Sequence, residues 1–409
     1  MSLSTPAKNR LALGSVFFTF FVDNLSWSIV FPIFAPFFLD LHNELFSPDF
    51  SAAARTTILG FFLAAFPLAQ FFGSPLIGEY ADRRGRKKAL IYTILFSLGG
   101  LALSAYSIQA KLLGLLFISR LISGLFSGNL SICLTAIVDI SKDEHFKMKH
   151  FGYLAVIAGF SFIIGTYLGG KLSDPEVSEL FNPAFPLWIA TFLTFLNFLF
   201  VFFAFKETKK PHDLVKFNFL EGLHNIQKAL QIAKIKVIYI IYFLFLFSWN
   251  ILLQFTPVHL IETFHFSNSE IGDMAAFMGI TWAIGSGFVN KFLVNRFASL
   301  KVLEFSLMAF TLFCAMIIFP KNVATFLLLL GICVILAGVA WPICTSLISS
   351  MADESVQGKI LGISQSMQSL AMALSPLIAV VTLIHTGLPF IVAALASLAA
   401  GLVYFKVKI

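Results

Sequence analysis

The chain has 409 residues, of which 58% are hydrophobic and 12% are charged, and its mean hydropathy is +0.89. Soluble domains carry about a quarter charged residues, so this composition excludes a water-soluble fold. The net charge of +7 does not indicate nucleic-acid binding, because the basic residues follow a topological pattern.

Apolar stretches long enough to cross a membrane recur along the whole chain. A helix needs roughly 20 apolar residues to span a bilayer core about 30 Å thick. In chain order, the expected crossings are 11–39, 56–78, 89–108, 112–139, 152–172, 185–205, 236–261, 269–293, 301–319, 323–351, 359–384 and 388–405. The sequence therefore predicts an all-α integral membrane protein with about twelve transmembrane helices.

A polar stretch at 206–235 separates the sixth expected crossing from the seventh. It predicts an N-terminal six-helix bundle at 1–205 and a C-terminal six-helix bundle at 236–409. Apolar residues recur near helical spacing within this basic stretch, which indicates either an amphipathic helix on the inner membrane surface or a loose tether. Weak echoes between the two halves, such as Asp139 and Asp353, favour an ancestral duplication.

Charged residues at the ends of the crossings predict the orientation. Lysine and arginine are retained on the cytoplasmic side, and most of them gather on one face, as in the cluster at 83–88. Acidic residues such as Asp40, Glu176 and Glu270 lie on the opposite face. Both termini are thus expected in the cytoplasm, in a multi-pass protein of the cell membrane, most simply the bacterial inner membrane.

Cysteine and histidine give no sign of a metal site, a cofactor or an enzyme. The 4 cysteines fall inside expected crossings, and the 8 histidines are scattered without metal-ligand spacing. A membrane-embedded enzyme would need clustered catalytic groups, and a channel would need a selectivity ring. We expect neither, and we expect no bound cofactor.

The loop between the second and third crossings carries the most specific motif. It reads Gly78, Glu79, Tyr80, Ala81, Asp82, Arg83, Arg84, Gly85, Arg86, Lys87 and Lys88. The glycines permit a tight turn, and an aspartate such as Asp82 can sit against a helix N-terminus, which is worth about 0.3–1 kcal/mol. The simpler interpretation is a basic anchor that only fixes topology.

This loop resembles the signature loop of the major facilitator superfamily. The resemblance implies the major facilitator fold, with two six-helix bundles, and a cytoplasmic gate. The gate residues that it implies are Gly78, Asp82, Arg83, Gly85, Arg86 and Asp139. Asp139, at the end of the fourth crossing, is the expected partner of Arg83.

Asp23 and Arg120 interrupt two otherwise apolar crossings. The helical rise places Asp23 about 18 Å from the inner start of its helix and Arg120 about 12 Å from the outer start of its own, which is similar depth in the bilayer. Because an isolated charge there costs roughly 2.5–3.5 kcal/mol, we expect the two to share an internal cavity. Their pairing indicates either proton coupling or a permanent salt bridge.

Both residues add to the family resemblance. Arg120 followed by Gly124 resembles the fourth-helix signature of proton-coupled members, and Asp23 resembles the first-helix aspartate of the tetracycline-exporter-like branch. The fifth crossing departs from the antiporter signature, because the expected proline is missing from the run Gly165 to Gly170. The missing proline weakens the resemblance to antiporters and does not affect the resemblance to transporters in general.

Polar and aromatic residues inside the crossings are expected to point inward, away from lipid. The predicted substrate cavity comprises Asn24, Trp27, Asn129, Trp249, Asn250, Gln254, Trp341, Gln365 and Gln368. Each tryptophan has interhelical packing as an alternative role. We predict a monomeric, proton-coupled transporter that works by alternating access and exports drugs or small amphipathic metabolites. The alternative is proton-coupled uptake of a nutrient or a metal-chelating metabolite.

Overall fold

The computed structural model describes residues 6–40, 43, 45–46, 50–140, 144–208, 233–350, 357–383 and 385–407. These residues are helical or lie in short connections, with no strand among them. The chain divides into two units, which are described separately: the first contains 1–33, 44–47 and 69–221, and the second contains 34–43, 48–68 and 222–409.

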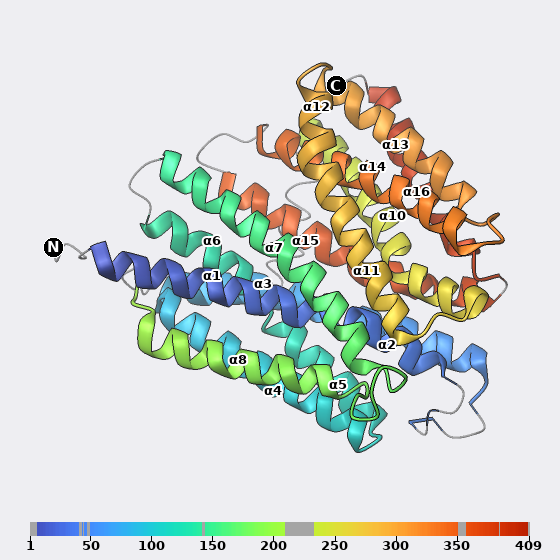
Figure 1. The fold of residues 1–409 in the computed structure, drawn as a ribbon. Coiled ribbons are helices and arrows are strands. Elements are labelled where there is room, and N and C mark those ends of the chain that lie inside the picture. The colour runs from blue at the N-terminus through green and yellow to red at the C-terminus, as the bar shows by residue number, and fades with distance from the viewer. Residues whose placement is uncertain are drawn as a thin grey trace. The chain divides into compact units, whose positions relative to one another are not determined.

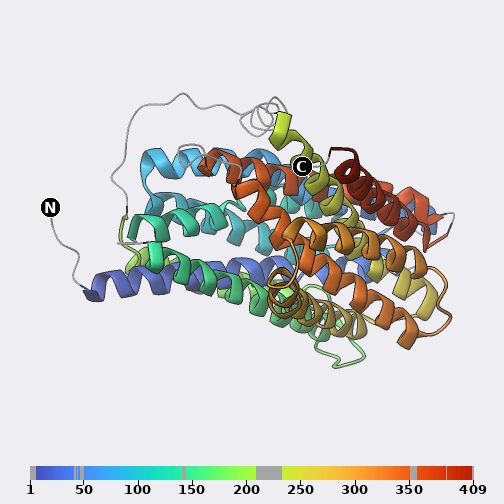
Figure 2. The same ribbon diagram turned by 90° about the horizontal axis from the view of Figure 1, so that it is seen from above.

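In the first unit, helices that are distant in sequence run side by side (Figures 1 and 2). Its helices are α1 (Pro6–Ser28), α4 (Arg86–Gln109), α5 (Leu113–Leu125), α6 (Asn129–Ile140), α7 (Glu144–Ser173) and α8 (Phe185–Ala204). Helix α1 packs against α6, α7 and α8, while α4 packs against α5, α6 and α8. The helices α2 (Phe31–Leu39) and α3 (Ala52–Arg84) contribute residues to both units.

The second unit is built around α10, which packs against α14, α15 and α16. Its helices are α10 (Ala233–Phe264), α11 (Asn268–Ala283), α12 (Asn290–Val294), α13 (Ser299–Met316), α14 (Val323–Ser350), α15 (Gln357–Leu374) and α16 (Leu388–Val407). A π-helical turn, η1 (Ile284–Val289), follows α11, and a 3₁₀-helix, η2 (Ser375–Leu383), follows α15.

The described residues contain 10 helical segments long and apolar enough to cross a membrane. They coincide with the first ten expected crossings to within a few residues at most ends. The eleventh expected crossing falls on α15 and η2, and the twelfth on α16, in which Leu388–Val403 forms a shorter apolar helix. The amphipathic helix predicted within 206–235 lies largely outside the described residues.

Several crossings are interrupted within the membrane-length segment. The first is broken at Ile29 and Val30, just before Pro32, which lacks the N–H needed to continue the helix. The fourth is broken at 126–128, so Asn129 begins a new helix. Interruptions of this kind are tolerated in membrane proteins where the freed backbone groups are buried in protein or line a cavity.

Glycines in α7 bring it into backbone contact with the broken first crossing. A Cβ at Gly165 would collide with Ser28 Oγ, and a Cβ at Gly169 would collide with the carbonyl oxygen of Ile29. Small residues are used in this way where helices have no hydrophobic driving force to associate. The run from Gly165 to Gly170 therefore permits close helix packing without the proline of the antiporter signature.

Candidate functional site

A small polar cavity lies within the first unit, between α1, α4, α6 and α8. It is lined by Val22, Asp23, Ser26, Ile94, Ser97, Leu101, Asn129, Thr194 and Asn197. Its volume of about 20 Å³ is enough to hold roughly one water molecule. Of these lining residues, Asp23 alone carries an ionisable group, so the cavity joins one carboxylate to neutral hydroxyl and amide groups.

Asn129 holds Asp23 in a fixed orientation. Its Nδ2 donates a hydrogen bond of 2.9 Å to Asp23 Oδ1, and its Oδ1 accepts a hydrogen bond from Thr93 Oγ1. Asn129 is 2% exposed, and it can be placed here because α6 starts at this residue, directly after the break at 126–128. The amide thus presents its donor side to the carboxylate, as suits an ionised Asp23.

The other wall of the cavity comes from α8. Thr19 Oγ1 donates to Asn197 Oδ1 at 2.9 Å, and the hydroxyls of Ser26 and Thr194 lie 3.4 Å apart. The sequence analysis did not select these residues, nor Ser97, because it singled out asparagine, glutamine and tryptophan and passed over hydroxyl side chains and the sixth crossing. The signal in the sixth crossing was the recurrence of Thr191, Thr194 and Asn197 every three residues among apolar residues.

Arg120 is buried in α5, with 8% of its surface exposed, and it is not among the residues that line the cavity. The hydrogen bond described above brings Asn129 to Asp23, so the structure joins a predicted coupling residue to a predicted substrate residue. The meeting of Asp23 with Arg120 stays a prediction. The helix is interrupted at 126–128, between Arg120 and Asn129. The relative directions of these two side chains therefore do not follow from the geometry of one straight helix.

The other predicted cavity residues divide between the two units. In the first, Asn24 Nδ2 donates to its own helix at the carbonyl oxygen of Phe20, and Trp27 packs at 6.0 Å against Phe162. In the second, Asn250 Nδ2 donates in the same way to Leu246. The remaining members are half-buried or buried on three helices of the second unit: Trp249, Gln254, Trp341, Gln365 and Gln368.

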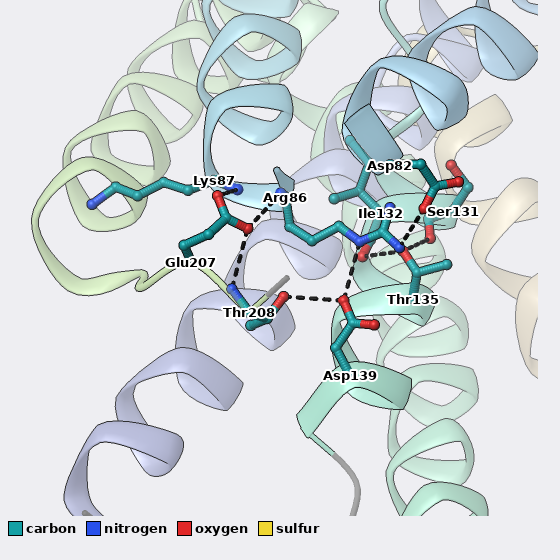
Figure 3. Close-up of polar contacts among 9 residues, drawn as sticks. All are labelled: Asp82, Arg86, Lys87, Ser131, Ile132, Thr135, Asp139, Glu207 and Thr208. Carbon is teal, nitrogen blue, oxygen red and sulfur yellow. Dashed lines mark hydrogen bonds and ion pairs between the residues drawn. The ribbon is translucent and has the colours of Figure 1, made fainter. Parts of the chain in front are cut away.

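Three of the predicted gate residues, Asp82, Arg86 and Asp139, form a charged cluster where the start of α4 meets the ends of α3 and α6 (Figure 3). Arg86 is central to it, because its guanidinium lies 2.8 Å from Asp82 Oδ1 and 3.1 Å from Asp139 Oδ2. The expected pairing of Asp139 with Arg83 is corrected by this geometry. Arg83 pairs instead with Glu79, one turn earlier in α3. Gly85 lies between the end of α3 and the start of α4, so the side chains of Arg83 and Arg86 project from different helices.

Glu207 joins this cluster from the segment after α8. Its carboxylate accepts backbone N–H groups at the start of α4, at 2.7 Å from Arg86 and 3.2 Å from Lys87 (Figure 3). A carboxylate at a helix N-terminus satisfies free donors and complements the helix dipole. The sequence analysis expected this role for an aspartate such as Asp82 and did not select Glu207, which stands among lysines in the polar stretch.

Gly85 makes the approach of Glu207 possible. Its φ of 97° lies in the left-handed region, and a Cβ there would collide with the Glu207 carboxylate. Gly78, the other glycine of the motif, has nothing within 4 Å of an added Cβ. The two glycines therefore serve different physical purposes.

Long apolar helices with interruptions, a half-buried carboxylate in a polar cavity and a charged interhelical turn are the features expected of a polytopic membrane transporter. The chain belongs to the Major Facilitator Superfamily, whose profile matches residues 16–286 and 238–408. It is therefore a multi-pass membrane protein that transports small molecules, and it is not an enzyme.

Known relatives agree with the resemblance to tetracycline exporters. The chain is 25% identical over 360 residues to the class H tetracycline resistance protein of Pasteurella multocida, covering 87% of this chain and 85% of that one. It is also 25% identical to major facilitator superfamily domain-containing protein 10 of Bos taurus, covering 91% and 87%. The crystal structure of the human organic anion transporter MFSD10 matches with a TM-score of 0.72 at 20% identity, covering 98% and 100%.

Proposed function

We propose that this chain is a proton-coupled secondary transporter in which Asp23 binds the coupling proton. The observation that carries the proposal is a carboxylate inside a polar cavity that has room for water and is surrounded by apolar helices. A charged group at membrane depth is costly, so its retention favours a role in an ion pathway over simple packing. A water molecule in the cavity would give the proton a route to Asp23.

The surrounding groups support reversible protonation. When Asp23 is ionised, it accepts the amide hydrogen bond of Asn129. When it is protonated, its hydroxyl can donate to an oxygen of the same cavity, such as Ser26 or Thr194. Each protonation state thus has partners, and the exchange between them would rearrange contacts among α1, α6 and α8. We propose that Arg120 responds to this change from α5.

The transport cycle would be alternating access, controlled at the cytoplasmic side by the charged cluster. Arg86 ties the α3–α4 turn to α6 through Asp139, and Glu207 ties the same turn to the segment after α8. These contacts would hold one conformation of the transporter and break in the other. The gate residues of the proposal are the motif residues from Gly78 to Arg86, together with Asp139 and Glu207.

The cargo we propose is a drug or small amphipathic metabolite, moved outward. This direction and cargo are supported by relatives whose names describe tetracycline resistance, at 25% identity for the class H protein. In this proposal the chain is a monomer with twelve crossings, both termini in the cytoplasm, and bundles at 1–205 and 236–409 joined by 206–235. Its expected location is a bacterial inner membrane.

Transport by purified protein in vesicles tests the coupling. We expect a proton gradient to drive tetracycline accumulation by the wild type, while Asp23→Asn abolishes gradient-driven accumulation and retains exchange of labelled for unlabelled tetracycline. Asp273→Asn, which changes an exposed acid in the second unit, serves as a matched control and should accumulate tetracycline normally. Equal gradient-driven accumulation by wild type and Asp23→Asn would remove Asp23 from the coupling step.

A further inference from the structure

Three of the 5 tryptophans of this chain gather within the second unit. Trp249 of α10 lies 4.6 Å from Trp282 of α11, and Trp282 lies 6.4 Å from Trp341 of α14, measured between ring centroids. The rings are tilted by 41° and 55°. Trp282 is thus the central member of a cluster that joins three helices, and the sequence analysis selected only its two neighbours.

Partial exposure distinguishes this tryptophan cluster from the aromatic core of the unit. The largest core aromatics, including Tyr239, Tyr242 and Phe310, are less than 2% exposed. All three tryptophans are only half-buried, so each keeps part of its surface free. Residues that served purely as interhelical filler would be expected to be as enclosed as the core aromatics.

The backbone that follows Trp282 is irregular and closely packed. The π-helical turn η1 begins two residues later, at Ile284, and such turns occur frequently at functional sites. A Cβ at Gly338 would crowd the carbonyl oxygen of Trp282, and a Cβ at Gly285 would collide with that of Ile335. These two glycines hold α11 and η1 against α14, which fixes the position of Trp282 relative to Trp341.

The absence of charge around the three tryptophans limits the kind of ligand that they can bind. The segments 237–258, 274–290 and 323–350, which carry the three tryptophans, contain no charged residue. A site of this kind offers aromatic faces and apolar contact but no counter-ion. Its natural ligand group is a planar ring system, which tryptophan faces bind by offset or tilted stacking.

We propose that the cluster of Trp249, Trp282 and Trp341 binds a planar, uncharged ring system of the transported molecule. This inference rests on the proposed function for its cargo, but it concerns equilibrium binding in the second unit and does not depend on proton coupling. Trp282 is the specificity-determining residue, because it contacts both of the other rings.

The test measures tetracycline binding to protein in lipid nanodiscs by calorimetry, at one pH and without an ion gradient. Trp282→Leu should raise the Kd about two- to tenfold, the range that corresponds to one aromatic contact, whereas Trp282→Phe should raise it less. Trp188→Phe is the matched control, since Trp188 lies in the first unit and is 39% exposed. It should leave the Kd unchanged.

A second measurement does not require Trp282→Leu to fold. In a Trp188→Phe variant that keeps Trp27, tetracycline should quench tryptophan fluorescence and cholate, a saturated polycycle, should not, and adding Trp282→Phe should remove part of the quenching. Absence of binding, absence of quenching, or equal Kd values for Trp282→Leu and wild type would overturn the inference. Trp282-dependent binding without proton-driven accumulation would overturn only the proposed coupling.

Discussion

At the scale of single residues, the charged turn shows why a motif needs particular side chains at particular places. Arg86 is 3% exposed and carries a full positive charge, which requires the two carboxylates of Asp82 and Asp139 around it. Glu207 adds a third carboxylate, directed at backbone N–H groups instead of the guanidinium. Only a residue without a side chain at position 85 leaves room for it.

The two motif glycines should respond in opposite directions to the same substitution. Gly85→Ala places a Cβ at a left-handed φ and against Glu207, so we expect it to destabilise the protein by roughly 1–2 kcal/mol or more. Gly78→Ala adds a Cβ in open space within helix α3, where alanine is favoured over glycine by roughly 0.5–1 kcal/mol. Thermal unfolding of the two variants in detergent measures the difference, and equal melting temperatures would contradict it.

Residue identities at the site were predictable in part. Asp23 and the motif residues stand out because charges are rare in apolar crossings, and Asn129 was selected as a buried polar group. The partners were not predictable, because side-chain direction depends on where each helix is interrupted. The break at 126–128 directs Asn129 toward Asp23, and the turn at Gly85 makes Arg86 the partner of Asp139 in place of Arg83.

At the scale of helices, the interruption after α15 has a specific compensation. Pro376 has no N–H, so the carbonyl oxygen of Met372 lacks the donor that a continuing α-helix would supply. Gln254 Nε2 from α10 donates to that oxygen at 3.4 Å, and Ser375 Oγ donates to it at 3.3 Å. This contact gives Gln254, a predicted substrate residue, a structural role, although its Oε1 is buried without a hydrogen-bond partner.

A double-mutant cycle isolates this compensation. Gln254→Met keeps the volume of the side chain and removes the donor, which should cost about 0.5–1.5 kcal/mol of stability. In a Pro376→Ala background the restored backbone N–H can donate to Met372, so the same substitution should cost much less. Unfolding free energies of the four proteins give the coupling, and additive effects would show that Gln254 does not compensate for the proline.

The crossings themselves were the most predictable feature at this scale. Ten expected spans coincide with long apolar helices because a hydrocarbon core sets a minimum length that composition alone reveals. The internal irregularities η1 and η2 were not predicted. They depend on tertiary contacts, such as those of Gly285 and Gly338, that carry little signature in local sequence.

At the scale of the whole molecule, the uneven distribution of basic residues predicts how the protein lies in the membrane. The turn containing Arg86 and Lys88 should face the cytoplasm, whereas Lys321, between α13 and α14, should face outward. The 4 native cysteines are all buried, so they should react slowly with a polar thiol reagent. Single cysteines can therefore be introduced and labelled with little reaction of the native thiols.

Cysteines introduced by Lys88→Cys and Lys321→Cys should both react, because both positions are exposed. The predicted orientation places the two on opposite sides of the membrane. A membrane-impermeant maleimide added to intact cells should modify Lys321→Cys and leave Lys88→Cys unreacted, and inside-out vesicles should reverse the result. Wild type is the control for the native thiols. Labelling of both variants from one side would contradict the predicted orientation. It would also remove the Arg86 cluster from its proposed role as a cytoplasmic gate, because in the proposed export cycle that gate faces the compartment from which the molecule enters.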